Sequence, residues 1–208
     1  MTQLLFDRVN QRLCDATRGE FDPRTRAWRE GTVRGERITV RDAVKWLQRE
    51  SGTPCRAPVG VVGPRDAKSE HLIFAERLGR GLAEMGVTVL CGGLSGVMGA
   101  VSKGAGERGG TVVGLLPQGD WREANPYVTI PIATGIGAAR NAIIARASLC
   151  LVAVGGGYGT VSEVALGLQF GVPVFGLFEA APLPGARAVA DVDEALEQVA
   201  GVVLALLQ

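Results

Sequence analysis

Short apolar runs alternate with amphipathic stretches from about residue 57 onward. Each run has strand length, and each following stretch repeats its apolar positions every three or four residues. This alternation is typical of a parallel β-sheet wound with helices. We expect strands at 58–62, 87–91, 111–116, 127–132, 149–154 and 173–177, and helices at 69–85, 96–108, 137–147, 160–170 and 191–207.

The first 55 residues differ from the rest in composition and in hydrophobic pattern. They are rich in arginine, and their apolar positions predict short strands within 4–13 and 27–40 and a helix over 40–49. The pattern therefore predicts two parts: a small hairpin-and-helix appendage at 1–55, and a Rossmann-like, doubly wound α/β domain at 56–208.

Composition narrows the possible partners. With 208 residues, 47% of them hydrophobic, the chain can bury one substantial core plus an appendage. The formal net charge of +1, with acidic residues between the basic ones, argues against nucleic acid. Apolar runs of membrane-spanning length and a signal-peptide pattern are both missing from the sequence, so we expect a cytoplasmic protein without a membrane partner.

The sequence offers little support for a metal site. Its four cysteines are scattered without a C-x-x-C pair, and His71 is its one histidine. Cys91 and Cys150 fall in expected strands, where they are better explained as small core residues than as nucleophiles.

Glycine-rich turns mark the candidate site. Glycines at 155, 156, 157 and 159 separate the strand 149–154 from the next helix. Such a loop frees backbone N–H groups beside the positive end of a helix dipole, which favours a phosphate or carboxylate. Similar turns at 63–65 and 92–96 also follow strands, so we expect all three to meet in one crevice at the carboxyl edge of the sheet.

Two common nucleotide motifs are disfavoured. The dinucleotide fingerprint requires G-x-G-x-x-G after the first strand, where Gly63-Pro64-Arg65 stands, and an acidic residue after the second, where Cys91-Gly92-Gly93 stands. The P-loop requires G-x-x-x-x-G-K-[ST], and the stretch from Gly63 to Ser69 lacks its second glycine and one spacer.

Two charged residues near the last loop could have either a structural or a functional role. Thr160 and Glu163 have the spacing of a capping box, which would explain the glutamate by itself. Alternatively, Glu163 faces a neutral or cationic part of a ligand. Arg140 could form a surface ion pair, or supply a planar cation suited to an anion.

The segments Gly92–Val101 and Gly155–Glu163 resemble the two glycine motifs of the Lonely Guy (LOG) family, often mislabelled lysine decarboxylases, within the SLOG superfamily. The resemblance covers about 58–177 and implies a Rossmann-like fold, homodimeric or homotetrameric assembly, and phosphoribohydrolase activity on nucleoside 5′-monophosphates without a cofactor. By position, Arg140 and Glu163 would be the catalytic pair. The resemblance also implies that the amides of 156–160 hold the phosphate. Together with the other glycine turns, the expected ligand contacts are Gly63, Arg65, Gly92, Gly93, Gly96, Met98, Gly156, Gly157, Tyr158, Gly159 and Thr160.

Two departures from the LOG motif keep a second reading open. Gly155 replaces the motif's proline, and Asn141 replaces the basic residue that usually follows the arginine. These features look closer to the branch that includes molybdenum cofactor carrier proteins, which implies a phosphorylated pterin as bound ligand and no required catalysis. A structural or regulatory oligomer is a third alternative. Lysine decarboxylation is disfavoured because none of Lys45, Lys68 and Lys103 lies in a glycine loop.

Overall fold

The computed structural model describes residues 3–180 and 183–207, and the chain forms two compact units. One comprises residues 1–56 with 197–208, and the other comprises residues 57–196. The C-terminal residues from 197 onward, which the sequence pattern placed in the main domain, group with the N-terminal residues.

The N-terminal unit contains a five-stranded antiparallel sheet instead of the expected hairpin. Its order is β4-β3-β2-β1-β5, followed by helix α1 (Val40–Arg49). The strands are β1 (Leu4–Asp7), β2 (Arg12–Asp15), β3 (Gly19–Asp22), β4 (Ala27–Arg29) and β5 (Glu36–Arg37). Asp7, Asp15 and Asp22 each accept a hydrogen bond from a backbone N–H two residues later. These aspartate turns end the first three strands and explain why the expected long strands are split.

The end of helix α6 (Val192–Val203) is held by side chains of the same unit. Arg26 Nε donates to the carbonyl of Val203 at 2.9 Å, and Trp28 Nε1 donates to that of Leu204 at 2.8 Å. The last carbonyls of a helix lack partners within the helix, so these donors satisfy groups that would otherwise need water. This contact explains why the C-terminal residues join the N-terminal sheet.

The second unit is built on a seven-stranded, fully parallel sheet of order β12-β11-β10-β6-β7-β8-β9. Its strands are β6 (Val59–Val62), β7 (Val89–Cys91), β8 (Val112–Leu116), β9 (Ile130–Ala133), β10 (Leu151–Val154), β11 (Val174–Leu177) and β12 (Arg187–Ala188). The four residues of β6, β10 and β11 are all buried, as expected for strands covered on both faces. The predicted doubly wound α/β fold is confirmed, with β12 as an additional edge strand.

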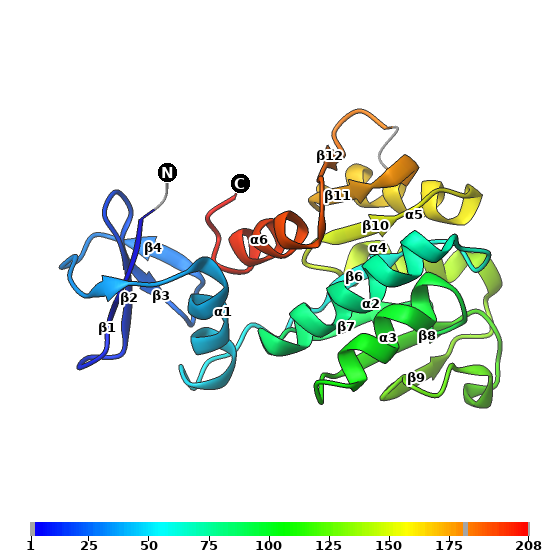
Figure 1. The fold of residues 1–208 in the computed structure, drawn as a ribbon, viewed down its shortest axis with the longest axis horizontal. Coiled ribbons are helices and arrows are strands. Elements are labelled where there is room, and N and C mark those ends of the chain that lie inside the picture. The colour runs from blue at the N-terminus through cyan, green and yellow to red at the C-terminus, as the bar shows by residue number, and fades with distance from the viewer. Residues whose placement is uncertain (1–2, 181–182, 208) are drawn as a thin grey trace. The chain divides into compact units, whose positions relative to one another are not determined.

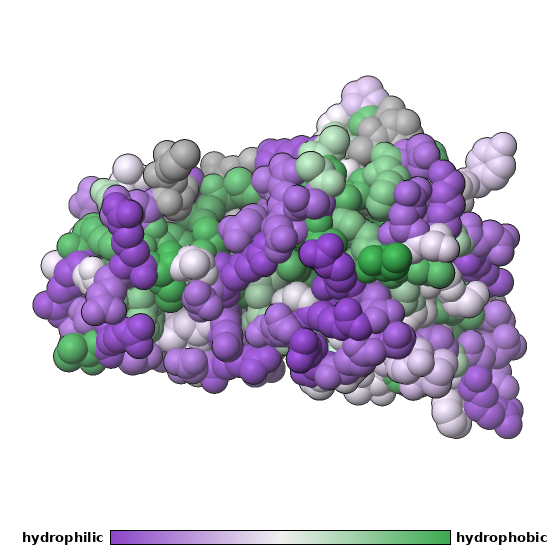
Figure 2. Space-filling model, viewed as in Figure 1, coloured by the Kyte–Doolittle hydropathy of each residue, from purple (hydrophilic) through white to green (hydrophobic). Residues whose placement is uncertain are grey.

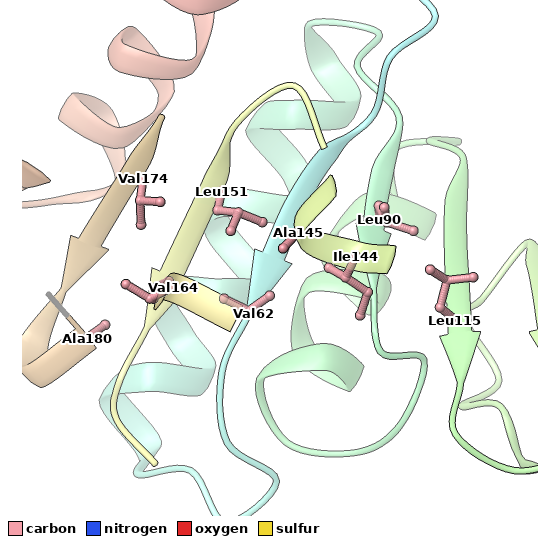
Figure 3. Packing of buried hydrophobic residues seen from close by; sticks show 10 residues of the cluster. Val62, Leu90, Leu115, Ile144, Ala145, Leu151, Val164, Val174 and Ala180 are labelled. Atoms are coloured by element: carbon pink, nitrogen blue, oxygen red, sulfur yellow. The ribbon is translucent and has the colours of Figure 1, made fainter. Parts of the chain in front are cut away.

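Helices cover this sheet on both faces (Figure 1). They are α2 (Ser69–Glu84), α3 (Val97–Gly106), α4 (Arg140–Ala147) and α5 (Tyr158–Gln169), with short 3-10 turns at 121–123, 137–139 and 178–180. In Figure 3, Ile144 and Ala145 of α4 and Val164 of α5 lie over strand residues such as Val62 and Leu151. These buried aliphatic side chains form the core that holds α4 and α5 on the sheet.

Helices α2 and α3 pack side by side through small residues. A Cβ at Gly104 would lie 1.9 Å from the carbonyl oxygen of Glu76, and one at Gly79 would lie 2.2 Å from that of Val101. Outside this contact, Lys103 pairs with Glu76 at 2.9 Å, and most of the surface over these helices in Figure 2 is hydrophilic. Among the helices of the described residues, none is long and apolar enough to cross a bilayer.

The central strand β6 defines the switch point of the sheet. Its neighbours are β7 on one side and β10 on the other, and the chain winds outward from it in both directions. Ligands of open parallel sheets bind beyond the carboxyl ends of the strands at this point. The turns after β6 and β10 are therefore the places to examine for a site.

Candidate functional site

A cavity of about 430 Å³ lies at the carboxyl ends of β6 and β10. Most of its wall comes from the turns after β6 and β10. Its charged side chains come from the turn after β6, which carries Arg65 and Asp66, and from α4 and α5. The lining residues are Val62, Gly63, Pro64, Arg65, Asp66, Gly92, Met98, Arg140, Asn141, Gly156, Gly157, Tyr158, Gly159, Thr160 and Glu163.

The N-terminus of α5 opens into this cavity. The helix begins at Tyr158, with Gly157 as N-cap and without a side-chain cap hydrogen bond. The expected capping box between Thr160 and Glu163 is therefore wrong, because the N-cap is Gly157, three residues before Thr160. Thr160 lies in the first turn, and the Glu163 side chain turns into the protein instead of back to the helix end.

Arg140 and Glu163 form a buried ion pair inside the cavity wall. Arg140 Nη1 donates to Glu163 Oε1 at 3.0 Å, and the two side chains are only 9% and 8% exposed. Burial raises the pKa of Glu163 to about 7, because the loss of water disfavours the carboxylate more than the Arg140 charge favours it. The alternative of a surface ion pair for Arg140 is excluded.

The guanidinium of Arg140 is held from several sides. Its Nη1 also donates to the side-chain oxygen of Asn141, whose amide nitrogen donates to Ser162 at 3.1 Å. A Cβ at Gly92 would lie 2.4 Å from Arg140 Nη2, so only glycine leaves room for the guanidinium there. The buried Nε of Arg140 has no hydrogen-bond partner within the described part of the chain.

Gly155 supports the loop from behind and does not line the cavity. Its φ is +69°, and a Cβ there would lie 2.6 Å from the ring of buried His71. Proline, with φ near −65°, cannot adopt this backbone. The departure from the LOG motif at this position therefore has a structural reason. His71 in turn packs on Phe178, with ring centroids 4.7 Å apart.

Most residues proposed from the sequence meet in the one cavity, and two do not. The residues brought together are Gly63, Arg65, Gly92, Met98, Arg140, Gly156, Gly157, Tyr158, Gly159, Thr160 and Glu163. Gly93 and Gly96 lie outside the lining. Both have positive φ, and a Cβ at Gly96 would lie 2.4 Å from the carbonyl oxygen of Pro64, so their glycines serve the turn.

The sequence reasoning missed four lining residues. Val62 and Pro64 flank the recognised Gly63, so proximity in sequence could have found them. Asn141 was noted only for differing from a motif, and its role in holding Arg140 appears only in three dimensions. Asp66 carries no signal in its sequence context.

Across the described residues, no group of three or more His, Cys, Asp or Glu side chains could hold a metal ion.

Comparisons with known proteins identify the family of the chain. The sequence model of the SLOG cluster4 family matches residues 56–202. A molybdenum cofactor binding protein from Rippkaea orientalis is 33% identical, with a TM-score of 0.69, over 71% of this chain and 98% of its own. The molybdenum cofactor carrier protein of Chlamydomonas reinhardtii is 41% identical, with a TM-score of 0.65, over 73% of this chain and all of its own.

A more distant similarity points to the other branch of the superfamily. A probable cytokinin riboside 5′-monophosphate phosphoribohydrolase of Oryza sativa subsp. japonica is 36% identical over 100 residues. The match covers 47% of this chain and 41% of the rice protein, less than half of either. The chain therefore belongs to the SLOG cluster4 family, within the LOG/SLOG superfamily and on the side of its molybdenum cofactor carriers.

Proposed function

We propose that this protein binds a phosphorylated nucleotide-like or pterin ligand, as a molybdenum cofactor carrier does. The observation that carries the proposal is the N-terminus of α5, which opens into the cavity without a side-chain cap. The amides of 156–160 would hold the phosphate, because helix N-terminal N–H groups and the helix dipole both favour an anion.

The charges around the cavity support an anionic ligand. Arg140 brings a guanidinium to the cavity, and the pKa of Glu163 near 7 means that its carboxylate offsets this charge only in part at neutral pH. The unsatisfied Nε–H of Arg140 also supports a bound ligand, because a buried donor without an acceptor is costly. A phosphate or an acceptor atom near it would satisfy this group.

Similarity to the carrier proteins supports the pterin form of the ligand. Two solved structures whose names give molybdenum cofactor binding or carriage match nearly their whole length to this chain. The molybdenum cofactor is then cargo, and holding it requires positioning and shielding without any bond being broken. The buried Arg140–Glu163 pair suits a binding wall of this kind.

The second candidate function is phosphoribohydrolase activity, favoured by the same ion pair. Cleavage of an N-glycosidic bond develops oxocarbenium character on the ribose, which a nearby carboxylate stabilises. Because a pKa near 7 keeps both forms populated, protonated Glu163 would give its proton to the leaving base and so become the carboxylate that stabilises the ribose cation. Water would then add at C1′ and release a proton to solvent. The similarity to the rice protein supports this alternative.

Calorimetric titration with inorganic phosphate, ribose 5-phosphate, nucleoside 5′-monophosphates and molybdenum cofactor tests the binding proposal. Gly157→Val should abolish binding, because Gly157 is extended (φ 165°) and a Cβ there meets nothing closer than 3.9 Å, so the fold tolerates a bulk that fills the cavity. Gly106→Val, at the end of α3 and open to solvent, is the matched control. Unchanged affinity in Gly157→Val would refute the phosphate assignment.

Chromatography of the same nucleotide mixtures separates carrier from enzyme. Release of free base that disappears in Glu163→Gln would establish the hydrolase reading. Tight binding of molybdenum cofactor without release of base from any nucleotide would establish the carrier.

We also propose that the protein is a homodimer or homotetramer. Ile130 and Ile132 are two residues apart on edge strand β9, so their side chains share one face of the sheet, and Ile136 follows the strand. All three are 42–49% exposed, and exposed large apolar side chains that lie near one another favour an interface. Light scattering of the purified protein measures the mass directly, and a monomer at micromolar concentration would reject this assembly.

A further inference from the structure

A chain of hydrogen bonds links the buried ion pair to the start of α5. Arg140 Nη1 donates to Oδ1 of Asn141, and the amide nitrogen of Asn141 donates to Ser162 Oγ at 3.1 Å. The hydroxyl of Ser162 in turn donates to the backbone carbonyl of Gly159 at 2.7 Å. We call this chain, from the Arg140 guanidinium to the Gly159 carbonyl, the relay. It connects a charged side chain of α4 to the backbone of the loop that lines the cavity.

Each side chain in the relay is used in one direction. Asn141 accepts through its oxygen and donates through its nitrogen, and the single hydroxyl hydrogen of Ser162 goes to the Gly159 carbonyl. Neither group can rotate without breaking a hydrogen bond at each end. Arg140 Nη1 carries two hydrogens and has two acceptors, because Glu163 Oε1 also accepts from it at 3.0 Å. Asn141 and Glu163 therefore hold the guanidinium from two helices.

The far end of the relay acts on an amide of the loop. The carbonyl of Gly159 and the N–H of Thr160 belong to one planar peptide unit, so the two groups rotate together. By holding the carbonyl, Ser162 also fixes the direction of the Thr160 N–H. This N–H is in the first turn of α5, where backbone donors lack an acceptor within the helix, and it is among the amides that we propose for the phosphate.

The residue type at position 141 makes the relay possible. A basic residue there, as in the LOG motif, offers donors but no acceptor, so it could not accept from Arg140. Its charge would also repel the guanidinium. Asn141 is half-buried and neutral, so it holds the guanidinium without offsetting its charge, which Glu163 does only in part.

The proton affinity of Glu163 reports how firmly Arg140 is held. Burial raises the pKa of Glu163 to about 7, and the charge and the hydrogen bond of Arg140 oppose this rise. The other charged or titratable groups around it are the buried thiol of Cys91 on β7, and Arg65 and Asp66, which line the same cavity. These three groups lie outside the relay. Loosening Arg140 alone therefore moves the pKa of Glu163 further upward.

We propose that Asn141 is a positioning residue that joins the Arg140 guanidinium, through Ser162, to the anion-binding start of α5. The assignment of an anion to this helix start rests on the proposed function. The effect of the relay on Arg140 and Glu163 is independent of any ligand, because all of its hydrogen bonds lie within the chain. The relay keeps the guanidinium beside Glu163 and the Thr160 amide in one direction at the same time.

Carbon-13 NMR titration of the Glu163 carboxyl in the ligand-free protein tests the relay. Asn141→Leu should move the midpoint upward from about 7, because Arg140 loses one of its two acceptors. Ser162→Ala should move it in the same direction by less, although Ser162 bonds to neither member of the ion pair. Ser162→Thr keeps the hydroxyl and should retain the native midpoint. An unchanged midpoint in Ser162→Ala overturns the relay.

Calorimetric titration with inorganic phosphate and ribose 5-phosphate tests the anion-binding end. Asn141→Leu should weaken both ligands about tenfold and Ser162→Ala about threefold, as expected for the loss of one or two hydrogen bonds, and Ser162→Thr should restore the affinity. Weakening in Asn141→Leu without any in Ser162→Ala would mean that Asn141 contacts the ligand itself, which overturns the positioning role. If the native protein binds neither ligand, the proposed function fails, and the NMR titration still decides the relay.

Discussion

Arg140 Nη1 lies 3.0 Å from Glu163 Oε1, and both residues are more than nine-tenths buried. The pair joins the first residue of α4 to the second turn of α5, so it fixes the two helix starts that frame the cavity. A buried pair of this kind is costly to break by removing one partner, because the other charge is then left in a poorly solvated place.

The pair predicts a pH dependence of stability. The pKa of Glu163 is raised from 4.5 to about 7, so between these values the folded protein binds more protons than the unfolded chain. The contribution of this group is fully present below pH 4.5 and is lost as the pH rises through 7. The interval between the two values corresponds to about 3 kcal/mol.

Urea denaturation of the native protein and Glu163→Gln from pH 4.5 to 8 measures this effect. The free energy of unfolding of the native protein, relative to the variant, should fall by on the order of 3 kcal/mol over that range. A difference that instead grows with pH would mean that Arg140 favours the carboxylate more than burial disfavours it.

The backbone conformation and the close neighbour at position 155 require glycine. Its φ of +69° disfavours any other residue, and a Cβ would meet the His71 ring at 2.6 Å. Gly155→Ala should therefore lower the free energy of unfolding by about 1–3 kcal/mol, and Gly155→Pro by more. Chemical denaturation checks both values.

Gly156→Ala is the control in the same loop, since the nearest atom to its added Cβ would be 3.5 Å away. It should leave stability nearly unchanged. In a His71→Ala background, Gly155→Ala should lower the free energy of unfolding by less than it does in the native protein, because the clash with the ring is gone and only the backbone strain remains. Equal stability of Gly155→Ala and the native protein would show that the loop relaxes freely.

The contact between α2 and α3 predicts opposite effects of the same substitution within one helix. Gly104→Ala places a methyl group 1.9 Å from the carbonyl oxygen of Glu76, so the helices must separate, at a cost of about 1–3 kcal/mol or more. Gly106→Ala meets nothing within 4 Å and should leave stability unchanged or raise it by up to about 1 kcal/mol. Thermal unfolding of both variants decides the matter, and similar losses would contradict the close packing.

The doubly wound sheet could be predicted from the sequence because its signal is local. The residues of β6, β10 and β11 are buried on both faces, and strands of this kind have continuous apolar sequences. Glycine turns at the carboxyl ends follow from the same chain order, so the positions of the loops around the cavity were also readable.

The N-terminal sheet was harder to read. Its strands have two to four residues each, too short for a clear alternation, and the first three end where an aspartate side chain caps a turn. The start of α5 was misplaced for a related reason. Thr160 and Glu163 have capping spacing, but the burial of Glu163 against Arg140 offsets any gain from a cap.

The sequence by itself determined the layered α/β architecture, the family motifs and the loops that surround the cavity, since each depends on residues adjacent in the chain. Only the tertiary structure decided that Arg140 and Glu163 form one buried pair and that Gly93 and Gly96 serve the turn. The physical reason is that burial and partnership are set by residues distant in sequence, and these quantities fix the charge state and the free hydrogen-bonding capacity of each group.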